Sequence, residues 1–193
     1  MKTMKKIVCV TLTTIMILLL LTGCGSKKND SGSGGSSTSA EALLQDIWGA
    51  FNEKDQFAVS GGDEKNAAQG PARFEINADN AETFQYLLHV TDEMYAQLEN
   101  DAATMQHMMN TNTFSAAVVK LKSGVDTKSF ADSYQQELNG QQWMCGFPDK
   151  MLVLSLGDYL VIGYGKMDNM DNLQKACAKV DSNCSIVIEA PLA

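Results

Sequence analysis

The order of strand-like and helix-like patterns after residue 113 leaves few folds open to this chain. Apolar, β-branched runs predict strands, and apolar residues three and four apart predict helices. In chain order, the pattern predicts strand, helix, strand, strand, helix and strand at residues 114–121, 126–139, 151–156, 159–164, 168–180 and 186–188. This βαββαβ order is that of the ferredoxin-like arrangement, a four-stranded antiparallel sheet with two helices on one face. We therefore expect an α+β fold with a ferredoxin-like core.

Helical patterns before this core predict additional N-terminal helices. Thr38 and Glu41 have the spacing of a capping box, and apolar residues follow at helical spacing up to Phe51. Residues 79–88 and 92–109 predict two more helices. The second face of the four-stranded sheet must be covered or face water, and these helices are the available cover.

Three lysines and an uncharged run at residues 7–21 give the start of the chain the pattern of a signal peptide. The run is short for a membrane span, which needs about twenty residues. It ends in LTGC at residues 21–24, which resembles the lipobox of bacterial lipoproteins. The resemblance implies that residues 1–23 are removed as a signal peptide and that Cys24 carries the lipid. The alternative is an ordinary cleaved signal peptide with an unmodified cysteine.

A tether and a single domain are expected behind this cysteine. Residues 24–39 are rich in glycine and serine and contain Lys27 and Lys28, which anionic lipid head groups attract. A flexible coil of this composition spans roughly 20 Å on average. We expect residues 40–193 to form one α+β domain at the extracytoplasmic face of the cell membrane, held there by the lipid anchor.

The charge of that domain excludes some partners. The whole chain has a net charge of −8, but the ten Lys/Arg and twenty-two Asp/Glu of residues 41–193 give −12. Nucleic acid and anionic membrane surfaces repel so acidic a domain. We therefore expect no nucleic-acid partner, and contact with the membrane only through the anchor.

Two stretches of the domain resemble a known family. They are MQHMMNTNTF at residues 105–114 and QQWMCGFPDK at residues 141–150. They are similar to segments of an uncharacterised family of bacterial lipoproteins, a domain of unknown function, and the resemblance covers roughly residues 42–193. It implies a single anchored domain. It supplies no activity and no catalytic residues.

A methionine-rich cluster is the candidate metal site. It lies within one expected helical turn and its end, and it comprises Met105, His107, Met108 and Met109. Thioether and imidazole ligands suit Cu(I). The three methionines are also spaced as the stripe that an amphipathic helix buries, and His107 lies off that stripe. Burial in the core is the expected role of the methionines, and binding of copper or another soft metal is the alternative.

Catalysis has little support in the sequence. Cys145 with His107, or alternatively with His89, is the candidate thiol and imidazole pair, and Arg73 is the single arginine of the domain. Cys145 lies between Trp143 and Phe147 and has no adjacent cation, which a reactive thiolate needs. We therefore expect no enzyme activity and no cofactor.

Cys177 and Cys184 are the candidate disulfide. They are expected at the end of a helix and at the start of the next strand, so the turn between them can bring their α-carbons within about 7 Å. Closing so short a loop would stabilise the fold by about 2.5 kcal/mol on chain-entropy grounds. The alternative is two separate thiols. If the bridge forms, Cys145 is expected to be buried and free.

These patterns together predict a lipid-anchored, non-catalytic module that binds an envelope protein or a small ligand outside the cytoplasm. The alternative is a lipoprotein that handles copper or another soft metal with the cluster at residues 105–109. The sequence has no paired-carboxylate pattern of a glycoside hydrolase and no glycine-rich phosphate loop.

Overall fold

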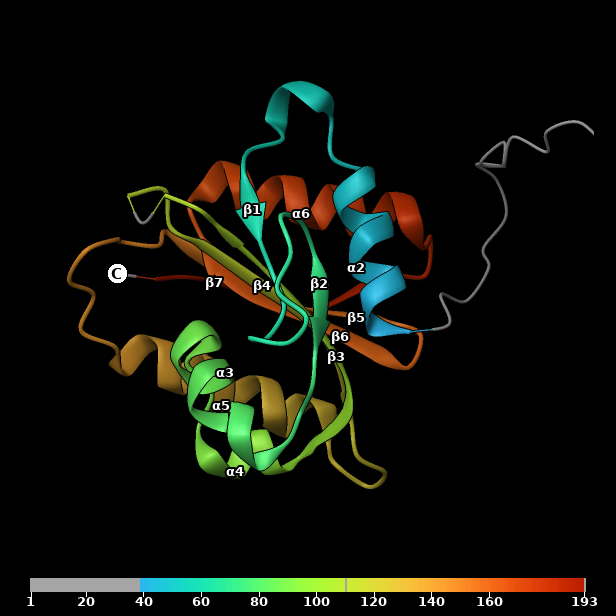
Figure 1. Cartoon of the computed structure of the whole chain (residues 1–193), viewed down its shortest axis with the longest axis vertical. Helices are drawn as coiled ribbons and strands as arrows, with labels where there is room; N and C mark the ends of the chain where they lie inside the picture. The colour runs from blue at the N-terminus through green and yellow to red at the C-terminus, as the bar shows by residue number, and fades with distance from the viewer. Residues whose placement is uncertain (1–38, 110, 193) are drawn as a thin grey trace, which may run out of the picture. The chain divides into compact units, whose positions relative to one another are not determined.

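The structure is a computed structural model that describes residues 39–109 and 111–192. Its helices and strands are, in chain order, α2 (Ala40–Gly49), η1 (Glu53–Asp55), β1 (Val59–Ser60), β2 (Ala72–Phe74), η2 (Ala78–Asn80), α3 (Ala81–Leu88), α4 (Asp92–Ala96), β3 (Leu98–His107), β4 (Phe114–Leu121), α5 (Thr127–Gly140), β5 (Lys150–Leu156), β6 (Tyr159–Gly165), α6 (Met167–Val180) and β7 (Ser185–Pro191). Figure 1 shows the strands between two groups of helices.

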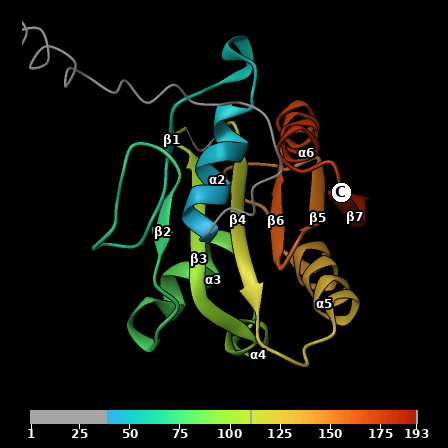
Figure 2. The ribbon, with the colours of Figure 1, turned by 90° about the vertical axis from the view of Figure 1, so that its right-hand side faces the viewer.

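The described strands form one seven-stranded sheet, and every pairing in it is antiparallel. The strand order is β1-β3-β4-β6-β5-β7, and β2 also pairs with β3, beside β1. Figure 2 shows the longer strands side by side in this order. The predicted α+β class is therefore confirmed.

Helices cover both faces of the sheet. One face packs against α2 and α6, through Leu44, Ile47 and Leu173 among others. The other face packs against α3, α4 and α5, through Phe84 and Tyr134 among others. Figure 1 shows the two helix groups above and below the sheet. Because side chains alternate between the faces of a strand, the inner strands must be apolar on both faces.

The predicted order of elements from residue 114 onward is confirmed, but the ferredoxin-like core is not. In the ferredoxin-like arrangement the last strand lies beside the first and both helices cover one face. Here β7 pairs with β5, at the far edge from β4, and α5 and α6 pack on opposite faces.

The direction of the two crossovers explains this difference. Helix α5 joins β4 to β5 across β6, and α6 joins β6 to β7 across β5. Both connections step toward the β7 edge, whereas β4 and β6 run in opposite directions. Because such crossovers are almost always right-handed, these two must pass over opposite faces of the sheet.

The long helix predicted at residues 92–109 is wrong. Helix α4 ends at Ala96, and residues 98–107 form β3. This strand pairs with β4 along one side and with β1 and β2 along the other. Pairing on both sides outweighs the weak helical preference of its alanine, methionine and glutamine residues.

The first described helix is tied to the sheet at its beginning. Ser39 caps α2 by accepting a hydrogen bond from Ala42 N at 3.2 Å, where Thr38 was the predicted cap. Asp101 of β3 accepts bonds from Ala40 N at 3.0 Å and from the Tyr159 hydroxyl at 2.7 Å. The chain therefore enters the domain where β3 and β6 begin.

Candidate functional site

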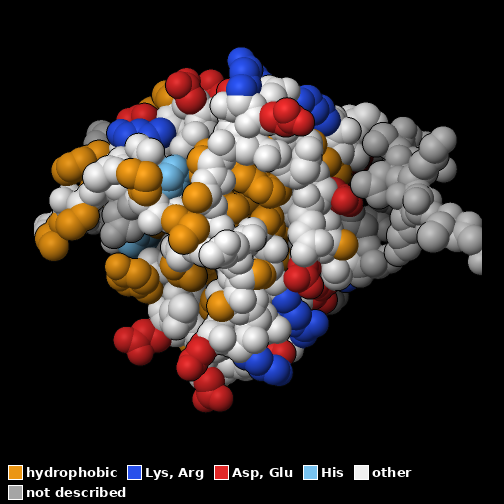
Figure 3. All heavy atoms as spheres, turned by 45° about the horizontal axis from the view of Figure 1, so that its top comes forward, with side chains coloured by type: hydrophobic (Ala, Val, Ile, Leu, Met, Phe, Trp, Pro, Cys, Tyr) orange, Lys and Arg blue, Asp and Glu red, His pale blue; other side chains and the backbone are white. Residues whose placement is uncertain are grey.

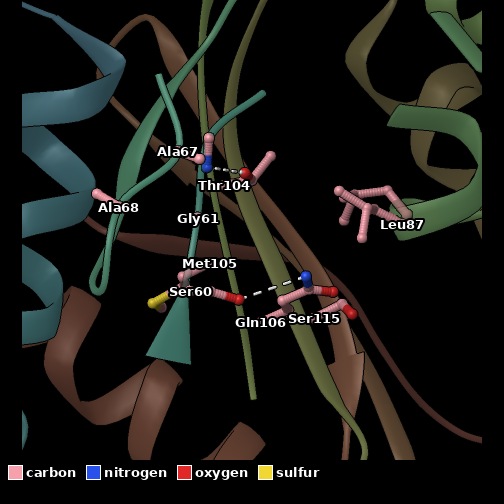
Figure 4. A pocket seen from close by; sticks show the side chains of 11 residues that line it. Ser60, Gly61, Ala67, Ala68, Leu87, Thr104, Met105, Gln106 and Ser115 are labelled. Atoms are coloured by element: carbon pink, nitrogen blue, oxygen red, sulfur yellow. Dashed lines mark hydrogen bonds between the residues drawn. The ribbon is translucent and has the colours of Figure 1, made fainter. Parts of the chain in front are cut away.

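Two adjoining hollows lie over the far ends of β3, β4 and β6. The first, which we call the inner cavity, has a volume of about 160 Å³ and lies between Gly61, Ala67, Leu87 and Thr104. Figure 4 shows Leu87 of α3 on one side of this cavity and the chain that carries Gly61 and Ala67 on the other.

A loop between β1 and β2 forms one wall of the inner cavity. Gly62 N donates to the Thr104 hydroxyl at 2.9 Å, which fixes the loop on β3 (Figure 4). Within the loop, the buried Asp63 carboxylate accepts bonds from the backbone of Lys65, Asn66 and Glu75. Burial raises the pKa of Asp63, but these hydrogen bonds outweigh it and leave the pKa below its ordinary value. The wall is therefore organised around a charged carboxylate.

The second hollow, which we call the open cleft, has a volume of about 350 Å³. It shares Leu87, Gln106 and Ser115 with the inner cavity, so the two hollows adjoin. Its walls come from the end of α3, the ends of β3 and β6, the start of β4 and residues 141–146. Both histidines of the chain, His89 and His107, line it.

Three aromatic rings in contact line the open cleft. The rings of His89, Trp143 and Tyr164 lie 5.0 to 5.3 Å apart, centroid to centroid. The Tyr164 hydroxyl donates to Leu87 O at 3.0 Å and interacts with Ser115. Rings so arranged give an apolar surface with polar edges, which suits a flat or apolar ligand.

His89 holds an unusual backbone conformation for its side chain. It ends α3 with a φ of 53°, the one positive φ of a residue other than glycine in the described part of the chain. Helix ends of this kind normally carry glycine, because a β-carbon costs about 1 kcal/mol there. Strained positions cluster at functional sites. The His89 imidazole lines the cleft although its backbone conformation is unfavourable for a residue with a β-carbon.

His107 is held by its neighbours in one tautomer. Its ring stacks on Phe57 with centroids 4.5 Å apart, and its Nδ1 accepts a hydrogen bond from Met109 N at 2.9 Å. A neutral imidazole that accepts at Nδ1 carries its proton on Nε2. The free nitrogen of His107 is therefore a donor.

The open cleft is uncharged at neutral pH. None of the described residues that line it is a lysine, arginine, aspartate or glutamate. Burial lowers the pKa of His89 and of His107, so both imidazoles are neutral, and burial raises the pKa of Tyr164 to about 12. An uncharged cleft in a domain of charge −12 suits a group without formal charge better than a charged one, because a charged group would find no charged partner among the lining residues.

Exposed apolar side chains gather around the mouth of this cleft. In the described part of the chain, seven large hydrophobic side chains are exposed. Five of them line the cleft or adjoin a lining residue in the sequence: Tyr86, Met108, Met109, Met144 and Phe147. Figure 3 shows hydrophobic side chains gathered around the two histidines. Contiguous exposed hydrophobic patches are typical of interaction surfaces in soluble proteins.

The structure separates the residues of the predicted metal cluster. Met105 is buried under α2 and α6, whereas Met108 and Met109 are exposed beyond the end of β3. The prediction that all three methionines fill the core is therefore wrong for Met108 and Met109. The helical turn that would have brought the three methionines together with His107 does not form, because residues 105–107 belong to β3 and residues 108 and 109 follow it. Among the described residues, no three His, Cys, Asp or Glu side chains are placed to hold a metal.

The predicted cysteine sites have mixed outcomes. Cys24 lies outside the described residues, so its lipidation stays a prediction. Cys145 is free but exposed, so its predicted burial is wrong. Cys177 is buried and Cys184 is half-buried, and both are free thiols in the structure. Arg73 lies on β2, and it is not among the residues that line the cleft with Cys145.

Sequence reasoning missed the aromatic cluster and the polar residues beside it. His89 follows an amphipathic helix at a position that usually carries glycine, and this was the one local signal of its role. Tyr164 and Gln106 gave no signal, because nothing in their own segments shows that the ends of β3 and β6 lie beside the start of β4. The stretches at 105–114 and 141–150 both contribute to the cleft.

Comparisons of the chain with protein-family models, with curated proteins and with solved structures found no match. The resemblance of residues 105–114 and 141–150 to a lipoprotein family therefore stays a prediction. No helix of the described part is long and apolar enough to cross a membrane.

Proposed function

We propose that this protein is a lipid-anchored, extracytoplasmic binding module that holds an uncharged ligand, or an uncharged segment of an envelope partner, in the open cleft. The observation that carries the proposal is the cleft itself: an aromatic floor without charged residues, surrounded by exposed methionine, tyrosine and phenylalanine side chains. Recognition sites for apolar and aromatic groups combine these features. The signal-peptide pattern and the sequence around Cys24 support the anchor.

The arrangement of the cleft favours binding over catalysis. A thiol nucleophile needs a base within hydrogen-bond reach and a group that orients this base. Within residues 39–109 and 111–192, neither imidazole hydrogen-bonds the Cys145 thiol, and His107 Nδ1 is already bonded to Met109 N. We therefore assign no catalytic role to these residues.

The anchor is tested by Cys24→Ser. Without the thiol no diacylglyceryl group can be attached, so the variant should leave the membrane fraction or keep its signal peptide. The measurement is detergent partitioning together with the intact mass of the purified protein. Cys145→Ser is the matched control and should stay anchored and processed. Unchanged partitioning and mature mass in Cys24→Ser would overturn the anchor.

The cleft is tested by photo-crosslinking in the native membrane. A benzoylphenylalanine at Met144, which is 84% exposed at the mouth of the cleft, should form a discrete crosslinked product. The same group at the exposed Ile186, on β7 and outside the cleft, should not. Tyr86→Ala should lower the yield from Met144 by about tenfold, because exposed aromatic side chains dominate such contacts.

The matched control for Tyr86→Ala is Met167→Ala, which also removes an exposed hydrophobic side chain but does not line the cleft. It should leave the crosslinking yield unchanged. Equal yields from Met144 and Ile186, or equal losses in the two alanine variants, would show that the cleft is not the binding surface.

A soft-metal site is the second candidate function. The thioethers of Met109 and Met144, the Cys145 thiol and both imidazoles line the same cleft, and such donors suit Cu(I). Two features rank this candidate lower: no three His, Cys, Asp or Glu side chains among the described residues are grouped to hold a metal, and Nε2 of His107 carries a proton. Stoichiometric copper in the purified wild type, lost in Met144→Leu, would reverse the ranking.

A further inference from the structure

Cys177 and Cys184 lie close together near the C-terminal end of α6. Cys177 lies in the last turn of α6 and is 0% exposed, in the core between α2, α6 and the sheet. Cys184 precedes β7 and packs partly buried against the same core. Their neighbourhood is therefore apolar and shielded, with one thiol deeper than the other.

Two backbone hydrogen bonds bring the cysteines together. Asp181 N donates to Cys177 O at 3.0 Å, which ends the helix, and Cys184 N donates to Asp181 O at 3.0 Å, which closes a turn. The chain reverses over these bonds, and the two thiols are close enough for each to shift the pKa of the other. Both side chains therefore belong to the same cluster of packed residues.

The two thiols differ in reactivity. The interaction with Cys177 lowers the pKa of Cys184, whereas that same interaction and burial raise the pKa of Cys177 well above its ordinary value. The thiolate is the nucleophile in thiol–disulfide exchange. Cys184 is thus both the more exposed and the more readily ionised member of the pair.

We propose that Cys177 and Cys184 form a redox-active pair that a small disulfide such as oxidised glutathione converts to an internal disulfide, with Cys184 as the attacking thiol. The Cys184 thiolate attacks one sulfur of the oxidant, whose S–S bond breaks and releases one glutathione thiolate. Cys177 then attacks the Cys184 sulfur, and its proton passes to the sulfur of the second glutathione as that thiol leaves. The protein loses two electrons and two protons, and one oxidised glutathione becomes two reduced ones.

The bridge would join the end of α6 to the start of β7. In the sheet, β7 is an edge strand that pairs with β5 alone among the described strands. Oxidation would therefore fasten the edge of the sheet to the helix that covers it, far along the sheet from the open cleft. The proposal does not depend on the function proposed for the cleft.

The sequence offers a direct assay for this bridge. Trypsin cuts after Lys175 and Lys179 and so separates Cys177, in residues 176–179, from Cys184, in residues 180–193. The full-length protein, purified in detergent, is treated with oxidised glutathione, alkylated without reduction and digested. Mass spectrometry should find these two peptides linked in most of the protein, and reduced to separate peptides by dithiothreitol.

Variants then test the order of attack. Cys177→Ala should trap glutathione on Cys184, and Cys184→Ala should leave Cys177 free of glutathione. Cys145→Ser is the matched control and should give the same linked peptides as wild type. Both cysteines recovered alkylated after oxidation of the wild type, a stable glutathione adduct on wild-type Cys184, or a link from Cys184 to Cys145 would each overturn the proposal.

Discussion

Met105→Ala should lower the free energy of unfolding by about 3 kcal/mol, while Met108→Ala should change it by less than about 0.5 kcal/mol. Met105 is 1% exposed on β3, paired with Ala116 of β4, and its side chain lies in the core beneath α2. Truncation there leaves a cavity that the paired strands cannot close. Met108 is 53% exposed after the strand has ended, so its removal takes little apolar surface out of the core.

Urea unfolding followed by circular dichroism measures both variants under the same conditions. The dependence of the unfolding free energy on urea concentration should be the same in both variants and in the wild type. The two methionines are three residues apart, so each is the other's control for the chemistry of the change. Equal losses of several kcal/mol from both would mean that they share a buried helical face, and β3 would then be wrong.

Gly61→Ala should destabilise the protein by about 3 kcal/mol, the upper range for overpacking at a close contact. A β-carbon on Gly61 would overlap the carbonyl oxygen of Thr104 and lie 2.7 Å from Gly70 O and 2.8 Å from Ala72 N. All three are backbone atoms, which cannot rotate away as a side chain can. The loop would have to leave β3, with loss of the bond from Gly62 N to Thr104.

Gly49→Ala is the matched control for this change. A β-carbon at Gly49, the last residue of α2, meets nothing within 4 Å, so the substitution should raise stability by about 0.5 kcal/mol. Thermal unfolding of both variants gives the comparison. Gly61→Ala with wild-type stability would show that the loop does not lie against β3 as described.

The local patterns after residue 113 predicted the elements well because each has its own signal. The run at residues 114–121 is a strand as predicted, Asp126 caps α5 by accepting from Ser129 N, and Gly157 forms the turn between β5 and β6 with a φ of 57°. Each of these features depends on a few neighbouring residues. Sequence periodicity and cap chemistry report such features directly.

The order of the strands in the sheet had no comparable signal. Strand β7 could form the same backbone hydrogen bonds with β4 as it does with β5. Its sequence therefore does not show which of the two it pairs with. Strand β3 was misread for a related reason. Its segment LENDAATMQH contains good helix formers, and its alternation is masked because both faces of the strand are covered.

Some residues that line the candidate site were named from the sequence, but the cleft itself was not predicted. The sequence analysis singled out residues 105–109 and Cys145, and the open cleft lies between these segments. The expected role of the methionines depended on a helix that does not form. The ring cluster of His89, Trp143 and Tyr164 joins three distant segments, and contacts of this kind arise only from the tertiary fold.

The tie between Asp101 and Ala40 sets how far the open cleft lies from the start of the described domain. The chain enters the fold where β3 and β6 begin, and the open cleft lies where the same two strands end. From Asp101 to His107 the extended strand covers about 20 Å. A partner bound in the cleft would therefore lie about one strand length from the point where the described chain enters the fold, and it could be held without contact with that end of the domain.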